Sequence, residues 1–150
     1  KYIIKIIRDM YSKVYIKNNY IVVKVKNSIN PQKAKEIYTA WLYNQCYFVF
    51  SKILNRMLSL TKKYNIKKPE IYVRNMKTRW GSCQPSRYRI GLNFQLIKAD
   101  EKCIEQVILH ELVHFIHPNH SSDFYGILNE LMPDWKSRKK SLEINYKDGV

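Results

Sequence analysis

All four histidines of this 150-residue chain lie between positions 110 and 120. The run His110-Glu111-Leu112-Val113-His114 places two of them four residues apart. In a helix this spacing puts both imidazoles on one face, one turn apart, where both can bind one metal ion. Glu111 lies beside the first of them without being a ligand itself. The run therefore predicts a metal-binding helix, here within residues 100–117.

A third ligand follows the pair. A catalytic zinc takes three protein ligands and leaves its fourth position to water. His120 is the nearest candidate, because Pro118 disfavours helix at His117 and lets the chain turn back. His117 itself lies seven residues after His110, about 10 Å along the helix axis, which is too far for both to bind one ion. We expect one Zn²⁺ ion on the first pair and His120, with His117 exposed or behind the ligands.

Positive charge is concentrated in the first half of the chain. The 27 lysines and arginines outnumber 12 acids, and residues 1–68 hold 15 of these bases with only Asp9 and Glu36 as acids. Such a region suits phosphate-bearing or acidic partners, nucleic acid among them, and the alternative is a solvated basic surface without a specific partner. The other ten acids share residues 69–150 with the histidines, where a divalent cation would tolerate them.

Length and composition indicate one domain. A chain of 150 residues that is 45% hydrophobic supports a single core, which predicts one domain over 1–150: a basic region of strands and a long helix at 1–68, then a metal-binding core at 69–150. Three cysteines without a Cys-x-x-Cys pair argue against a disulfide framework and suit a reducing cytoplasm. No apolar run reaches bilayer length, so we expect no membrane segment. Because the chain starts at Lys1 and enters a strand-like run at once, we expect further residues upstream.

The order of predicted elements is that of an α+β fold. Three strands are expected before residue 30, with Asn18-Asn19 as a hairpin turn. Asn30 and Pro31 then begin a long helix that continues to about residue 58. Strands at 70–74, from about 79, and at 88–94 precede the metal-binding helix, and helices at 122–132 and 134–145 end the chain, the first capped by Ser121. We expect a small, mostly antiparallel sheet packed on the long helix and the metal-binding helix.

Several segments together carry a family resemblance. They are Lys77-Thr78-Arg79-Trp80-Gly81-Ser82-Cys83, Leu92-Asn93, His110 to His114, and Asn119-His120-Ser121. The chain resembles the YgjP-like metallopeptidase domain, which is related to SprT-type and WLM-type zinc proteases, strongly over residues 74–142 and more loosely before. The resemblance implies a compact zincin-like domain with zinc on the three histidines and Glu111 as catalytic acid and base. Phe124-Tyr125 stands where the family has Phe-Trp.

The segment from Arg79 to Gly81 is a candidate for substrate binding. Gly81 beside Trp80 permits a close backbone approach, so this strand could accept an extended peptide by edge pairing. Arg79 could bind a carboxylate or a phosphate in fork geometry. The alternative is structural, with Trp80 as a core anchor and Gly81 as a β-bulge.

Three functional hypotheses follow. The first is a zinc-dependent hydrolase, foremost a peptidase acting on polypeptide, in which zinc activates water and Glu111 takes its proton and delivers it to the leaving amine. The second is a metal-dependent nucleotide phosphohydrolase, although the chain has no glycine-rich phosphate loop. The third is a nucleic-acid-associated module whose zinc is structural.

Overall fold

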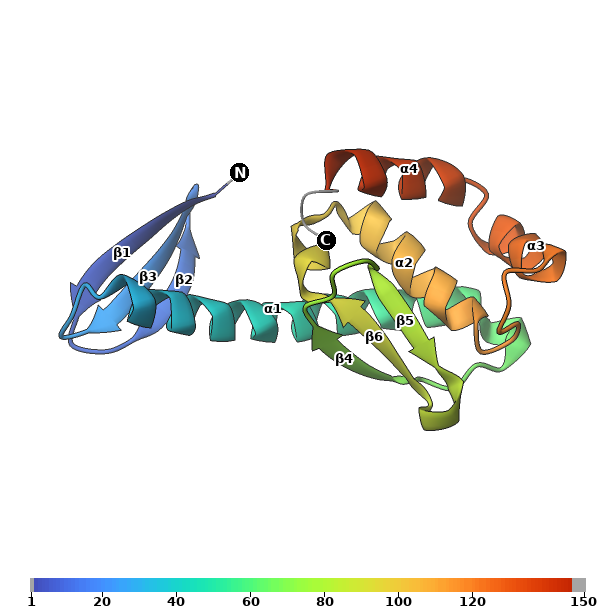
Figure 1. Ribbon diagram of the computed structural model, residues 1–150, viewed down its shortest axis with the longest axis horizontal. Coiled ribbons are helices and arrows are strands. Elements are labelled where there is room, and N and C mark those ends of the chain that lie inside the picture. The colour runs from blue at the N-terminus through green and yellow to red at the C-terminus, as the bar shows by residue number, and fades with distance from the viewer. Residues whose placement is uncertain (1, 147–150) are drawn as a thin grey trace. The chain divides into compact units, whose positions relative to one another are not determined.

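The computed structural model describes residues 2–146, and its class is α+β, as the sequence predicts (Figure 1). The helices are α1 (Pro31–Leu60), α2 (Glu101–Val113), α3 (Ser122–Leu131) and α4 (Trp135–Asn145). The strands are β1 (Ile3–Asp9), β2 (Lys13–Lys17), β3 (Tyr20–Lys26), β4 (Glu70–Arg74), β5 (Gly81–Gln84) and β6 (Arg89–Asn93). Among residues 2–146, no helix combines the length and apolarity needed to cross a membrane.

The chain divides into two compact units, residues 1–45 and residues 46–150, so α1 begins in the first unit and ends in the second. Each unit is described by itself. That the whole chain acts as one domain stays a prediction.

The first unit is a three-stranded sheet with the first turns of α1. Its strand order is β1-β3-β2, and Asn18, with φ of 52°, forms the predicted turn between β2 and β3. The Oδ1 atom of Asn30 accepts hydrogen bonds from the backbone N–H groups of Gln32 (2.9 Å) and Lys33 (3.3 Å), which caps α1 where the sequence predicts a helix start. One face of the sheet packs on α1 around the buried residues Ile21, Val23, Val25 and Ala34.

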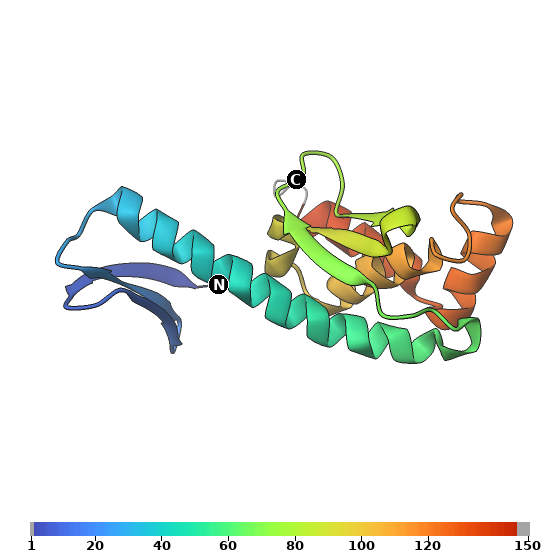
Figure 2. The ribbon, with the colours of Figure 1, turned by 90° about the horizontal axis from the view of Figure 1, so that it is seen from below.

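The second unit places its sheet against α2. The strand order is β4-β6-β5, and the central strand β6 buries Ile90 and Leu92 completely. These two residues belong to a core that includes residues of α1 and α2, among them Phe50 and Leu112. In Figures 1 and 2, α4 lies along α2, and β5 is the strand beside α2.

Both sheets are mixed, whereas the sequence predicts one sheet that is mostly antiparallel. In each, the last two strands pair antiparallel, and the first strand adds in parallel to the free edge of the third, as β1 does to β3 and β4 does to β6. The hairpin order of neighbouring strands reveals the antiparallel pairs alone, because the parallel partner depends on packing between segments distant in sequence.

Candidate metal centre

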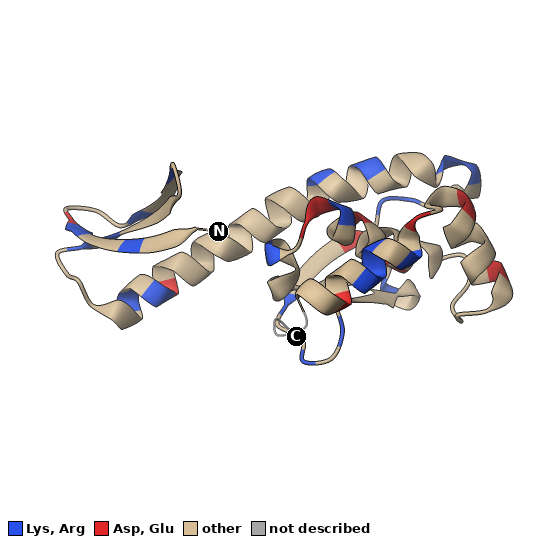
Figure 3. Ribbon diagram, turned by 90° about the horizontal axis from the view of Figure 1, so that it is seen from above, with Lys and Arg blue, Asp and Glu red and all other residues tan. Residues whose placement is uncertain are grey.

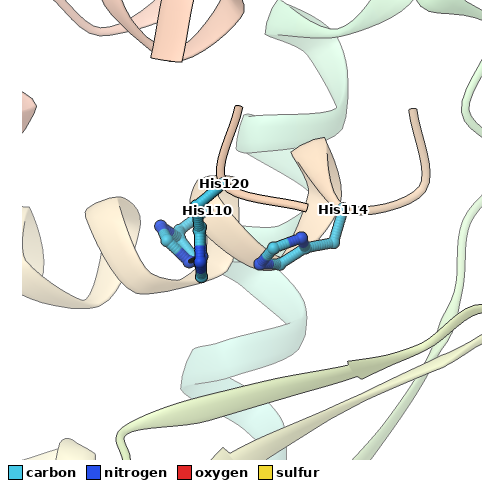
Figure 4. Close-up of side chains that lie close together, drawn as sticks. All are labelled: His110, His114 and His120. Carbon is cyan, nitrogen blue, oxygen red and sulfur yellow. Dashed lines mark hydrogen bonds between the residues drawn. The ribbon is translucent and has the colours of Figure 1, made fainter. Parts of the chain in front are cut away.

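The C-terminal end of α2 and the loop after it bring three histidines together. His110 lies in the last turn of α2, and His114 caps the helix with φ −63° and ψ −18°, so the predicted four-residue spacing is kept on helical backbone. The loop then returns His120 to the pair, and one ligand nitrogen of each ring lies within 4.8 Å of the other two. Figure 4 shows the side chains of the three histidines close together. Nε2 of His110 lies 2.9 Å from Nε2 of His120.

The helix ends earlier than the sequence predicts, at Val113 rather than His117. Turns replace it from His114 onwards, and the backbone N–H of Phe115 donates to the carbonyl of Leu112 over 3.1 Å. Pro118 disfavours helical backbone at the residue before it. The turns between His114 and Pro118 begin the return of the chain towards His120.

His117 supports the cluster through its backbone. Its carbonyl oxygen lies 3.2 Å from Nδ1 of His114. When Nδ1 donates to that carbonyl, the lone pair of the His114 ring is on Nε2, the tautomer that a metal-binding imidazole needs. The structure thus places His117 behind the three converging rings and leaves its own ring outside the cluster.

The ring of Phe124 packs against all three imidazoles. Its fully buried ring lies 4.9 Å from the centroid of His110, 4.6 Å from that of His114 and 4.9 Å from that of His120. Ser121 caps α3 as predicted, because its Oγ accepts a hydrogen bond from the backbone N–H of Phe124 over 3.3 Å. The sequence did not predict that Phe124 packs against the histidines, although the aromatic pair after the third histidine was the signal for this contact.

Tyr125 holds the third histidine from the side. Its ring stacks on His120 at 6.1 Å and on Trp135, the first residue of α4, at 5.4 Å. The indole N–H of Trp135 in turn donates to Oδ1 of Asn129 over 2.6 Å. A tyrosine therefore keeps an aromatic support for His120 at the position where the resemblance implies a tryptophan.

Burial lowers the pKa of two of the clustered rings, those of His110 and His114. It lowers the pKa of His110 to about 3, with a smaller effect from the neighbouring His114 and His120. Burial also lowers the pKa of His114, and the hydrogen bond to the carbonyl of His117 opposes the change. Neutral imidazoles are the form that binds a metal ion, so the fold presents these two rings as ligands without first removing a proton.

Glu111 is buried beside the cluster with 6% of its surface exposed. Burial raises the pKa of its carboxyl to about 8, and the positive charge of Arg79 opposes the rise. Gly81 on β5 makes room for this side chain, because a Cβ atom there would lie 2.7 Å from Oε1 of Glu111. Gly81 is thus an extended strand residue that lets α2 and β5 approach closely, and not the bulge that the sequence also allowed.

The three clustered histidines and Glu111 line one cleft of about 740 Å³. The three candidates for substrate binding also line it: Arg79 is exposed, Trp80 is half-buried against the core, and Gly81 begins β5 at the edge of the sheet. The structure therefore brings the sequence-derived site residues to one place.

Asn93 positions the loop that carries Arg79. This residue is fully buried at the end of β6, and its Nδ2 donates to the carbonyl oxygens of Met76 (2.9 Å) and Arg79 (3.0 Å). Its backbone N–H also bonds the carbonyl of Trp80 over 2.8 Å. In the sequence it stood out only as part of the family resemblance, because a polar residue at a strand end does not reveal the carbonyls it will bind.

The donor set of the cluster fits zinc. Three imidazole nitrogens with an open side are a common ligand set of catalytic zinc. The 2.9 Å between two of the nitrogens is close to the ~3.3 Å expected for two nitrogen ligands ~2.0 Å from one tetrahedral ion. The residues present are therefore suited to one zinc ion.

Comparison with known proteins places the chain in a family. The family model described as "YgjP-like, metallopeptidase domain" matches residues 1–145. No curated protein sequence gives a significant match. Among solved structures, the fold is similar to that of the metallopeptidase zymogen of Pyrococcus abyssi abylysin, with a TM-score of 0.59 and 17% identity over 65% of this chain and 95% of that one. By the extent of the family match, the chain is a member of the YgjP-like metallopeptidase domain family.

Proposed function

We propose that this chain is a zinc-dependent peptidase with one zinc ion held by His110, His114 and His120. The observation that carries the proposal is the convergence of three imidazoles in a cleft shared with one buried carboxylate, that of Glu111. Membership in a metallopeptidase family supports it. When bound, zinc supplies Lewis acidity, which polarises a carbonyl group and lowers the pKa of water from ~16 towards ~7.

Glu111 is the proposed general base and acid. Its carboxyl faces the cleft from the helix that carries two of the histidines, next to the space that a water molecule and a scissile bond would share. A pKa raised by burial towards the working pH suits a group that accepts a proton from water and then gives it to the leaving amine. Arg79 and a bound cation both favour the ionised form that must act first.

The cleft is suited to an extended polypeptide. β5 is an edge strand that lines it from Gly81 to Cys83, so its free backbone groups can pair with a substrate backbone. Arg79 adds a guanidinium at the same rim for a carboxylate of the substrate.

The test compares two matched substitutions on α2. Glu111→Gln should keep zinc and lower kcat on an unfolded polypeptide by at least ~100-fold, since general acid–base catalysis contributes ~10²–10⁴-fold. Glu101→Gln makes the same chemical change at an exposed position in the first turn of the helix and should leave turnover unchanged.

Two results would contradict the proposal. One is hydrolysis of polypeptide by the Glu111→Gln variant at the wild-type rate. The other is release of phosphate from nucleoside triphosphates, sensitive to the same substitution, with no cleavage of polypeptide, which would identify a phosphohydrolase.

A further inference from the structure

The sheet of the first unit has a second face, which does not pack on α1. Side chains alternate between the faces of a strand, and Ile21, Val23 and Val25 of β3 point into the core with α1. Tyr20, Lys24 and Lys26 of the same strand therefore belong to the opposite face.

Register brings further lysines to that opposite face. Lys5 of β1 and Tyr15 of β2 both pair with Val22, Lys13 pairs with Lys24, and Lys17 pairs with Tyr20. Six of these residues make up what we call the Lys–Tyr face: Lys5, Lys13, Lys17, Lys26, Tyr15 and Tyr20.

The charge of the Lys–Tyr face is not balanced by acids. Its four lysines are exposed, and within residues 2–146 none of them forms an ion pair. Lys24 differs, because its Nζ lies 2.6 Å from a carboxylate oxygen of Asp9. Asp9 is thereby already engaged, and the other acid of the first 45 residues, Glu36, lies on α1. The face thus presents four uncompensated positive charges on one small sheet. Figure 3 marks the lysine and arginine positions along the ribbon.

Aromatic rings lie among these charges. Tyr20 is 42% exposed, and Tyr15 is half-buried two register positions away, beside Val22. Lys24, which pairs with Asp9, lies 5.8 Å from the centroid of the Tyr15 ring and 4.8 Å from that of Tyr11, so it packs on these two rings. Rings on the same face as lysines without ion pairs offer stacking surfaces and phosphate contacts together.

We propose that the Lys–Tyr face binds single-stranded nucleic acid. Unpaired bases stack on exposed aromatic rings without regard to sequence, and lysines beside the rings contact the phosphates that connect those bases. A duplex hides the faces of its bases, so the rings favour a single strand over a duplex of the same length. Acidic peptides and anionic membranes offer charge to the lysines but no series of flat bases to the tyrosines. This binding site is independent of the proposed peptidase activity.

The test uses the full chain and a fluorescently labelled 12-nucleotide single strand, with binding followed by anisotropy at several salt concentrations. If the four face lysines contact four phosphates, they should contribute about 2.8 to the slope of log affinity against log salt, since each contact to a single strand contributes ~0.7. Replacing the four face lysines by glutamine should remove that part of the slope. The double variant Lys33→Gln and Lys35→Gln changes two exposed lysines of α1 in the same unit. Its slope should differ from that of the wild type by less than the ~0.7 that one phosphate contact contributes.

The rings are tested separately, because lysine changes alone would also weaken non-specific attraction. Tyr20→Leu should weaken binding at least about five-fold at constant salt, and Tyr20→Phe, which keeps the ring, should not. Glu111→Gln should bind the strand as the wild type does. Far-ultraviolet circular dichroism of each variant checks that the fold is retained.

Any one of four results would overturn the proposal. Tyr20→Leu could bind the single strand as tightly as the wild type does, or a 12-base-pair duplex could bind as tightly as the single strand or more tightly. Changing Lys33 and Lys35 could weaken binding as much as changing the face lysines does, or the face lysines could support binding to vesicles containing phosphatidylserine while the single strand does not bind.

Discussion

A Cβ atom on Gly81 would lie 2.7 Å from Oε1 and 2.9 Å from Cγ of Glu111, so the first residue of β5 determines where this carboxylate rests. We expect Gly81→Ala to push the carboxylate aside and to lower turnover by about 100-fold, the scale of a 1 Å misplacement of a catalytic group. Zinc content should stay at the wild-type level, because the three atoms nearest to the new methyl group belong to Glu111 and Val107 and not to a histidine. Steady-state kinetics and metal analysis of one preparation check both. Wild-type turnover in Gly81→Ala would mean that the position of Glu111 is not critical.

Two other glycines, Gly91 and Gly126, make opposite predictions for stability. At Gly91 in β6, a Cβ atom would lie 2.5 Å from Cζ of Tyr72, whose hydroxyl is held by Ser82 (3.1 Å) and Gln84 (3.2 Å). At Gly126 in α3, no atom lies within 4 Å of the added Cβ apart from its chain neighbours and the nearby backbone of its own helix. Gly91→Ala should therefore lower the free energy of unfolding by ~1–3 kcal/mol, and Gly126→Ala should raise it by ~0.5–1 kcal/mol because alanine favours helix. Denaturant unfolding checks both signs, and a stabilising Gly91→Ala would contradict the packing of β6.

The stack of Tyr125 on His120 predicts a graded effect on metal affinity. Tyr125→Phe keeps the ring between His120 and Trp135, so its zinc affinity should stay within about two-fold of the wild type. Tyr125→Ala frees His120 and should weaken zinc binding about ten-fold, at the low end of the range for residues that orient metal ligands. Competition with a chelating dye measures both variants. Equal affinity of the alanine variant would show that the stack does not position the ligand.

The thiols predict a pH dependence of chemical modification. Burial raises the pKa of Cys46 to about 12, and burial together with the charge of Glu111 raises that of Cys83 to about 12. Burial raises the pKa of Cys103 as well. Only thiolates react with iodoacetamide, so in the native protein alkylation at pH 8 should be much slower than in urea, and its rate should still be rising as the pH passes 9. Rapid alkylation of native Cys46 at pH 8 would contradict its burial.

Local signals predicted the parts of this fold that depend on neighbours in sequence. Asn30 and Pro31 predicted the start of α1, Asn18 predicted a hairpin, and Ser121 predicted the cap of α3, because each acts on backbone groups within a few residues. The histidine spacing predicted in the same way that three rings would meet.

Features that depend on distant segments were not predictable in this way. Nothing within β1 or β4 indicates a parallel partner, and the two mixed sheets follow from pairings across intervening strands. The sequence assigned no role to Phe124 beyond its match to the family's aromatic pair, since its contact with three imidazoles requires the loop to return. The early end of α2 at Val113 depends on turns that Pro118 favours only from a distance of several residues.

The zinc content of four histidine variants tests the metal centre most directly. The wild-type chain should hold one zinc ion, and His110→Ala, His114→Ala and His120→Ala should each lose it after gel filtration with a weak chelator. His117→Ala is the matched control, because its side chain lies outside the cluster and its backbone carbonyl remains for Nδ1 of His114. Circular dichroism checks that each variant is folded. A full complement of zinc in any of the three ligand variants, or its loss in folded His117→Ala, would contradict this metal centre.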